Sequence, residues 1–139
     1  MPEGAERHAR AKNSATVLAF DFGLKRIGVA VGEPELGTAH PLATIAAPGF
    51  ESISKLISEW RPAQLVVGWP VAANGAHPLA KRVERFARQL EGRFHLPVAR
   101  IDERFSSVEA ESRLRGVKGK RVDSVAAQLL LEQYFHEAA

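Results

Sequence analysis

The first part of the chain consists of short apolar runs separated by turns. Residues 16–22 (TVLAFDF) are almost continuously apolar until Asp21 interrupts them, and such a run is typical of a strand covered on both faces. Residues 27–31 (IGVAV) and 40–46 (HPLATIA) predict two more strands, with a turn at residues 34–37 between them. Two short connections in succession favour an antiparallel meander.

Beyond residue 50 the apolar period changes from strand to helix and back again. Apolar residues spaced three and four apart predict helices, and short buried runs predict strands. The last helix is apolar around most of its circumference and is therefore expected to be largely buried. The elements expected here are a helix over 53–60, a strand over 64–67, a helix over 78–90, a strand over 97–101, a helix from 106 or 107 to 114, and a helix over 122–135.

This order of elements predicts an α/β fold. Three meandering strands followed by alternating helices and strands give a five-stranded mixed sheet with helices on both faces. A chain of 139 residues is the size of one domain. Residues 1–15 are polar and lack the apolar segment of a signal peptide, so we expect a flexible tail, a folded domain over 16–139 and a cytoplasmic protein.

The composition of the chain excludes several kinds of functional site. The chain has no cysteine, which removes disulfides, zinc–thiolate sites and thiol nucleophiles. No apolar run approaches the ~20 residues that a membrane-spanning helix needs. The net charge is +3, from 19 Lys and Arg against 16 Asp and Glu, so the distribution of charge has to show whether the partner is anionic.

Asp21 is the polar interruption of an otherwise apolar strand. A buried carboxylate costs free energy unless it is paired, hydrogen-bonded or bound to a metal. The alternative is an aspartate that starts the turn and accepts hydrogen bonds from the amides before Gly23. The residue type alone does not choose between these interpretations.

Three more carboxylates occupy places where ligand sites form. Asp102 and Glu103 follow the fifth strand, and open α/β sheets place their crevices at such strand ends. Strand alternation sends the two side chains to opposite sides, so at most one joins Asp21, while the other caps the next helix and pairs with Arg104. Asp123 opens the last helix, where an aspartate is usually a cap. Because this helix must pack on the sheet, its first turn can also present Asp123 to the crevice.

A cluster of carboxylates indicates a divalent cation. Like charges raise one another's pKa values unless a cation compensates. Oxygen ligands without cysteine or a histidine cluster favour Mg²⁺ or Mn²⁺ over zinc. Two such ions about 4 Å apart are a known arrangement for phosphodiester hydrolysis. We therefore expect two Mg²⁺ or Mn²⁺ ions and a nucleic-acid substrate.

A basic run precedes Asp123. Residues 112–122 (SRLRGVKGKRV) contain five cations and no acidic residue. A solvated loop would explain the run, but its position favours a grip on phosphates. Lys25 and Arg26 lie close to Asp21 in sequence and either contact the same backbone or only keep a hairpin soluble. The predicted nucleic-acid contacts are Lys25, Arg26, Arg104, Arg113, Arg115, Lys118, Lys120 and Arg121.

The two tryptophans and the helix over 78–90 carry weaker signals. Trp60 continues an apolar helical stripe and is assigned to the core. Trp69 follows a strand end, where it either stacks on a base or packs, and packing is favoured. The cations of the helix are treated as surface because two glutamates dilute them; they are Lys81, Arg82, Arg85 and Arg88.

Four segments resemble the bacterial YqgF family over residues 16–136: LAFDFGLKRIGVAVGE, LVVGWP, RIDERFSSVEAESRL and VDSVAAQLLLEQYF. That family comprises Holliday-junction-resolvase-like proteins that are generally regarded as nucleases maturing the 5′ end of 16S rRNA. The resemblance implies an RNase H-like fold and metal-site roles for Asp21, Glu103 and Asp123, so it favours Glu103 over its neighbour. The chain departs from the family pattern at residues 68–70 (Gly-Trp-Pro for Gly-Leu-Pro) and 74–76 (Asn-Gly-Ala for Asp-Gly-Ser or Asp-Gly-Thr), and its basic run is shorter.

The function that the resemblance implies is hydrolysis of a phosphodiester in precursor 16S rRNA, with ribosomal particles as partners. Cleavage of branched DNA is an alternative, because the same fold and metal site serve either substrate. A nucleic-acid-binding protein without catalysis is a second alternative. A phosphotransfer protein of the actin or hexokinase type is disfavoured, because the chain lacks a second similar domain to close over ATP.

Exchanging the four cations within residues 113–120 for glutamine is expected to weaken nucleic-acid binding. Losing four phosphate contacts lowers the slope of log affinity against log salt by roughly three. Fluorescence anisotropy with a labelled oligonucleotide at several salt concentrations measures both quantities. An unchanged affinity would remove the run from the binding surface.

Overall fold

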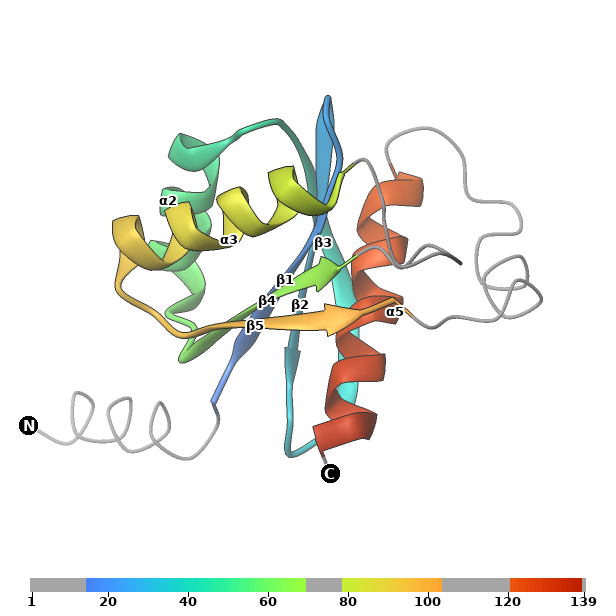
Figure 1. The fold of residues 1–139 in the computed structure, drawn as a ribbon. Helices are drawn as coiled ribbons and strands as arrows, with labels where there is room; N and C mark the ends of the chain where they lie inside the picture. Colours follow the sequence, from blue (N-terminus) through green and yellow to red (C-terminus); the bar gives the residue numbers. More distant parts are fainter. Residues whose placement is uncertain (1–14, 70–78, 104–120, 139) are drawn as a thin grey trace, which may run out of the picture.

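The computed structural model describes residues 15–69, 79–103 and 121–138 (Figure 1). Within these ranges the chain forms an α/β domain of strands and helices in the expected order. The strands are β1 (Val17–Phe22), β2 (Arg26–Glu33), β3 (Thr38–Ala46), β4 (Gln64–Trp69) and β5 (Val98–Asp102), and the helices are α2 (Phe50–Trp60), α3 (Ala80–Phe94) and α5 (Arg121–Ala138).

The strands form one five-stranded sheet in the order β3-β2-β1-β4-β5. β1 pairs antiparallel with β2, and β2 with β3, which confirms the meander. β4 lies parallel to both β1 and β5. Because β1, β4 and β5 point the same way, their carboxyl ends meet at one edge of the sheet, called the carboxyl edge below.

Helices cover both faces of the sheet, as predicted (Figure 1). Leu18 and Phe20 of β1 belong to one core cluster, which includes residues of α2 and α3. Val17 and Ala19 alternate with them and belong to a second cluster, which includes residues of α5. The side chains of β1 therefore fill two cores at once, and Asp21 continues the row that faces α5.

Small residues let α5 lie close against β2. Gly28, Ala30 and Gly32 alternate along the side of β2 that faces this helix. A Cβ atom on Gly28 would lie 1.9 Å from the backbone carbonyl oxygen of Asp123, and one on Gly32 would lie 2.8 Å from the ring of Phe135. Gly28 pairs with Asp21 across the β1–β2 ladder. The first turn of α5 is thus seated directly beside Asp21.

Of the predictions made for segments outside the sheet, one is wrong, one is confirmed, and two fall outside the described residues. Trp60 was expected in the core but is 39% exposed, because it is the last residue of α2 and this helix buries only Ile53 fully. The buried last helix is confirmed by α5. The expected N-terminal tail, apart from residue 15, and the expected helix ending at 114 lie outside the described ranges. Within those ranges, no helix is long and apolar enough to cross a membrane.

Gly28→Ala is expected to destabilise the protein, since its methyl group would overlap the backbone of α5. Overpacking of this kind costs about 1–3 kcal/mol of unfolding free energy or more. Gly92→Ala is the matched control, because a Cβ there meets nothing within 4 Å and the residue lies in helix α3. It should raise the unfolding free energy by about 0.4–1 kcal/mol. Urea denaturation compares the variants, and equal effects would contradict the close seating of α5.

Candidate active site

Three carboxylates from separate elements gather at the carboxyl edge, on the side of the sheet that α5 covers. Asp21 lies near the end of β1, Glu103 directly follows β5, and Asp123 lies in the first turn of α5. The side chains of Asp21 and Glu103 are hydrogen-bonded to each other, and the charge of Asp123 acts on Asp21 as well. The structure therefore brings together the three side chains that the resemblance singled out.

Strand alternation explains why Glu103 and not Asp102 joins the cluster. Ile101 belongs to the core beneath α5, and Glu103 has the same parity along the chain. The backbone N–H of Glu103 donates to the carbonyl oxygen of Trp69 at 3.2 Å, so the pairing with β4 continues past the end of β5. Asp102 is exposed.

Gly68 of β4 makes room for the Glu103 side chain. A Cβ atom on Gly68 would lie 2.7 Å from Oε1 of Glu103 and 2.8 Å from a methyl group of Leu130 in α5. Any larger residue would therefore displace either the carboxylate or the helix. The missing side chain leaves space for the glutamate in the middle of the carboxyl edge.

The environment of Asp21 favours its protonated form. Burial raises the pKa of Asp21 well above its ordinary range, and the charge of Glu103, the hydrogen bond with it and the charge of Asp123 all act in the same direction. Two carboxyl groups can share a hydrogen bond only if a proton lies between them. Without a cation, Asp21 therefore holds its proton to a higher pH than an ordinary aspartate does.

Asp123 has one oxygen that is not satisfied by hydrogen bonds. Its Oδ2 atom is buried and lies 3.1 Å from Nε of Arg26, which is the distance of an ion pair. The contact does not have hydrogen-bond geometry, and the oxygen has no hydrogen-bond partner within the described ranges. The Arg26 side chain is 52% exposed, so about half of it is accessible to solvent. A buried carboxylate oxygen in this condition favours a further cationic neighbour.

The donors of this cluster fit a divalent cation of the Mg²⁺ or Mn²⁺ type. All are carboxylate oxygens, one of them is unsatisfied, and their mutual repulsion is what a cation relieves. The described ranges contain no group of three His, Asp or Glu side chains already at coordinating geometry. The role of the three carboxylates as metal ligands stays a prediction.

The structure describes some of the predicted phosphate contacts. Lys25 is exposed in the β1–β2 turn, and Arg26 pairs with Asp123. Arg121 is the first residue of α5. Arg104 and the four cations of residues 113–120 lie outside the described ranges. These residues remain predicted contacts.

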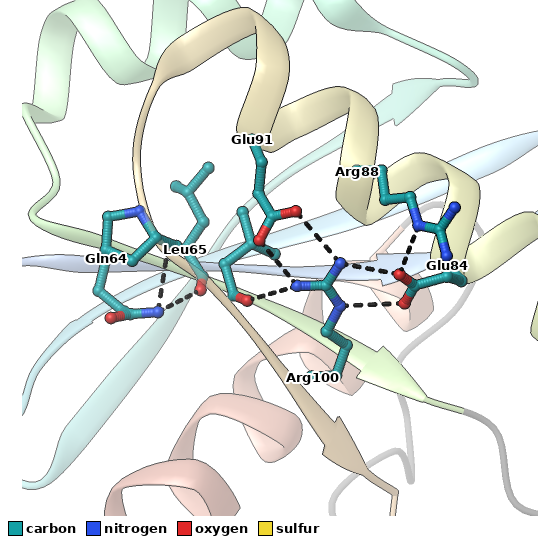
Figure 2. A network of polar contacts seen from close by, with 8 residues as sticks. Gln64, Leu65, Glu84, Arg88, Glu91 and Arg100 are labelled. Atoms are coloured by element: carbon teal, nitrogen blue, oxygen red, sulfur yellow. Dashed lines mark hydrogen bonds and ion pairs between the residues drawn. The ribbon is translucent and has the colours of Figure 1, made fainter.

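Sequence reasoning missed a clamp on the opposite face of β5 (Figure 2). The Arg100 guanidinium donates two hydrogen bonds to Glu84, both at 3.1 Å, and two to Glu91, at 2.9 and 3.3 Å. Arg88 binds Glu84 as well, at 2.9 Å. The pKa values of both glutamates are lowered, chiefly by hydrogen bonds from Arg100. The signal was present in the sequence, because Glu84 and Glu91 lie seven residues apart, on one helix face.

The architecture and the acidic cluster together define a class. A five-stranded mixed sheet in the order β3-β2-β1-β4-β5 with helices on both faces is the RNase H-like fold. The Holliday junction resolvase of fowlpox virus has the same fold: it superposes with a TM-score of 0.54 at 12% identity, over 88% of this chain and 98% of that one. Its complex with junction DNA gives the same TM-score at 11% identity, over 88% and 97% of the two chains.

Sequence comparison then identifies the family. The family model of RuvX, described as a Holliday junction resolvase, matches residues 15–137. A protein of Nitrosomonas europaea is 52% identical over 88% of this chain and 90% of its own length. One of Methylobacillus flagellatus is 50% identical over 97% of each chain. Both are named as candidate pre-16S rRNA nucleases. The chain belongs to the RuvX family, which confirms the expected nuclease class and the resemblance to YqgF proteins.

Asp21 is expected to make the cation-free protein less stable as the pH rises. The pKa of Asp21 is higher in the folded than in the unfolded chain, so folding takes up a proton between the two values. The free energy of unfolding therefore falls from about pH 4 through the folded pKa of Asp21, and stays lower above it. Asp21→Asn removes this decrease and should exceed the wild type in stability at neutral pH. Urea denaturation in EDTA at several pH values measures the effect.

Glu84→Gln is the control, because its effect on the free energy of unfolding at neutral pH should have the opposite sign to that of Asp21→Asn. The pKa of Glu84 is lowered in the folded state, chiefly by hydrogen bonds from Arg100, so its contribution to stability is present at neutral pH and lost on acidification. The glutamine variant should therefore be the less stable one at pH 7. An Asp21→Asn variant that is also destabilised at pH 7 would show that Asp21 is not repelled by its neighbours.

Proposed function

We propose that this nuclease is a metal-dependent endonuclease that hydrolyses a phosphodiester bond during 5′-end maturation of precursor 16S rRNA. The observation that carries the proposal is the meeting of Asp21, Glu103 and Asp123 at one edge of an RNase H-like sheet. Relatives about half identical over most of the chain supply the substrate, since they are named for pre-16S rRNA. The proposed substrate belongs to precursor ribosomal particles in the cytoplasm.

In this proposal Asp21, Glu103 and Asp123 hold two Mg²⁺ or Mn²⁺ ions. Such ions activate water and stabilise charge on the leaving oxygen when bound. The chain itself contributes position and charge: the three carboxylates would supply the oxygen ligands of the ions, and Arg26 holds Asp123 in place. The exposed part of the Arg26 guanidinium is free to donate to a phosphate of the substrate, as predicted from its nearness to Asp21 in sequence.

Cleavage of a four-way DNA junction is the second candidate. The description of the RuvX family favours it. The carboxylate cluster would serve either substrate, because its residues do not reveal whether a 2′-hydroxyl is read. The names of the relatives with about half identity over most of the chain favour RNA, which is therefore the first choice.

Asp21→Asn, Glu103→Gln and Asp123→Asn are each expected to lower the cleavage rate by more than about 100-fold. Each substitution removes a negatively charged ligand of the metal ions that lie beside the reacting phosphate. The assay uses a labelled pre-16S rRNA fragment and a synthetic four-way DNA junction, with Mn²⁺, Mg²⁺ or EDTA, and gel analysis of the products. EDTA should abolish wild-type cleavage of the preferred substrate.

Asp102→Asn is the matched control, since Asp102 is a carboxylate of the same strand end that alternation turns to the other side of the sheet. It should retain wild-type activity, and circular dichroism checks that all variants are folded. Cleavage that survives the three site substitutions would reject the site. Cleavage of the junction without cleavage of the rRNA fragment would reverse the order of the two candidates.

A further inference from the structure

We propose that the groove between Trp69 and helix α3 binds a single-stranded segment of the substrate, with an unpaired base stacked on Trp69 and its phosphates on Lys81 and Arg85. This inference rests on the proposed function and specifies the form of its substrate. The nucleic acid would be single-stranded where it passes from the carboxylate cluster across the end of β4.

The groove has the size and lining of a ligand site. It is an open groove with a volume of about 640 Å³ beside α3, and Trp69 forms the aromatic part of its wall. Ligand pockets in proteins commonly measure roughly 300–1,000 Å³. Trp69 is half-buried: it packs against the core beneath α3 and also lines the groove. A ring held in this way presents a surface without first having to be ordered.

Positive charge concentrates on the helix that forms the other wall. Residues 80–94 carry five cations and two glutamates, a net charge of three that equals the formal net charge of the whole chain. Lys81 and Arg85 line the groove, are exposed, and lie one helical turn apart. Among the described residues, no carboxylate lies within ion-pair distance of either. They are therefore available to phosphates.

The acidic residues of α3 do not cancel this charge, because another element engages them. Arg100 of β5 binds both glutamates of the helix from below, as Figure 2 shows. Glu84 also lines the groove, but its oxygens accept hydrogen bonds from Arg100 and Arg88. The clamp thus neutralises the acidic side chains and leaves Lys81 and Arg85 as the unpaired charges of the groove.

The groove adjoins the carboxylate cluster across a single strand end. Gly68 and Trp69 are consecutive residues of β4, and alternation turns them to opposite faces. Gly68 makes room for Glu103 on the α5 side, whereas Trp69 lines the groove on the α3 side. The carbonyl oxygen of Trp69 also accepts the N–H of Glu103. A single strand of nucleic acid that crosses the end of β4 therefore contacts both the carboxylate cluster and the groove.

Stacking on Trp69 requires an unpaired base. The faces of paired bases are covered by their neighbours in a duplex, whereas single strands splay bases onto aromatic side chains. Each such contact is worth about 1–3 kcal/mol on alanine substitution. The groove should consequently favour single-stranded over double-stranded nucleic acid, whereas a purely electrostatic surface favours the duplex because of its higher charge density.

Tryptophan fluorescence tests the stacking directly. The chain has two tryptophans, so Trp60→Phe leaves Trp69 as the only one. Measurements use the full chain with Asp21→Asn in EDTA, so that nothing is cleaved. Single-stranded 12-mers of RNA and of DNA are expected to quench the emission at saturation, and a duplex of the same sequence is not. Equal quenching by RNA and DNA would indicate that the groove does not read the sugar.

Affinity measurements by anisotropy separate stacking from charge. Trp69→Leu should weaken single-strand binding by about 10-fold or more and leave duplex binding unchanged, while Trp69→Phe retains most of the affinity. Trp60→Leu is the matched aromatic control and should have no effect. The double variant Lys81→Gln, Arg85→Gln should lower the slope of log affinity against log salt for single strands by about 1.4. Lys55→Gln, an exposed cation of α2, is the control for charge.

Three outcomes would overturn the inference: wild-type affinity of Trp69→Leu for single strands, equal losses for single strands and duplex, or no binding of single strands by the parent protein. Circular dichroism and the Trp69→Phe variant show whether a loss reflects unfolding. These readouts need no cleavage and no cation. Failure of the nuclease proposal in the cleavage assay is thus distinguishable from failure of the groove.

Discussion

The close approach of helix α5 to strand β2 is the constraint on which the site depends. Side chains ordinarily hold the backbone of a helix away from the strands beneath it, but Gly28 has no side chain where the backbone of Asp123 passes. Because Gly28 is paired with Asp21, the same contact that seats the helix brings two acidic residues together. The third, Glu103, enters through the space left by Gly68. The two glycines, which have no side chains, thus let the three carboxylates come together.

The assembled cluster opposes the stability of the fold that creates it. Three carboxylates at one sheet edge repel one another, and the protein lessens that cost through the raised pKa of Asp21, which favours its neutral form, and through the contact of Arg26 with Asp123. Neither device removes the repulsion. Residual strain of this kind is common at functional sites, where affinity for a charged ligand matters more than the stability of the unliganded state.

Much of this arrangement was predictable from the sequence. Apolar periodicity gave the order of strands and helices, and a lone aspartate in a buried run indicated Asp21. Periodicity could not choose between Asp102 and Glu103, because it fixes alternation but not which side faces α5; the family resemblance made that choice. Trp60 was assigned wrongly, since a helical stripe shows which way a side chain points and not how far the core extends. The contact at Gly28 depends on residues nearly one hundred positions apart, and no local pattern encodes it.

The Arg100 clamp has a mechanical consequence. β5 is an edge strand, held by hydrogen bonds to β4 alone within the sheet, and edge strands open more readily than central ones. Arg100 fastens it to α3 three residues before Glu103. Fraying of that strand would withdraw Glu103 from the cluster, so a charged contact on one face of the sheet helps to hold a proposed metal ligand on the other face. A rise in ionic strength therefore weakens two interactions of this site: the ion pairs of Arg100 on the opposite face of the sheet, and the attraction between the protein and its substrate.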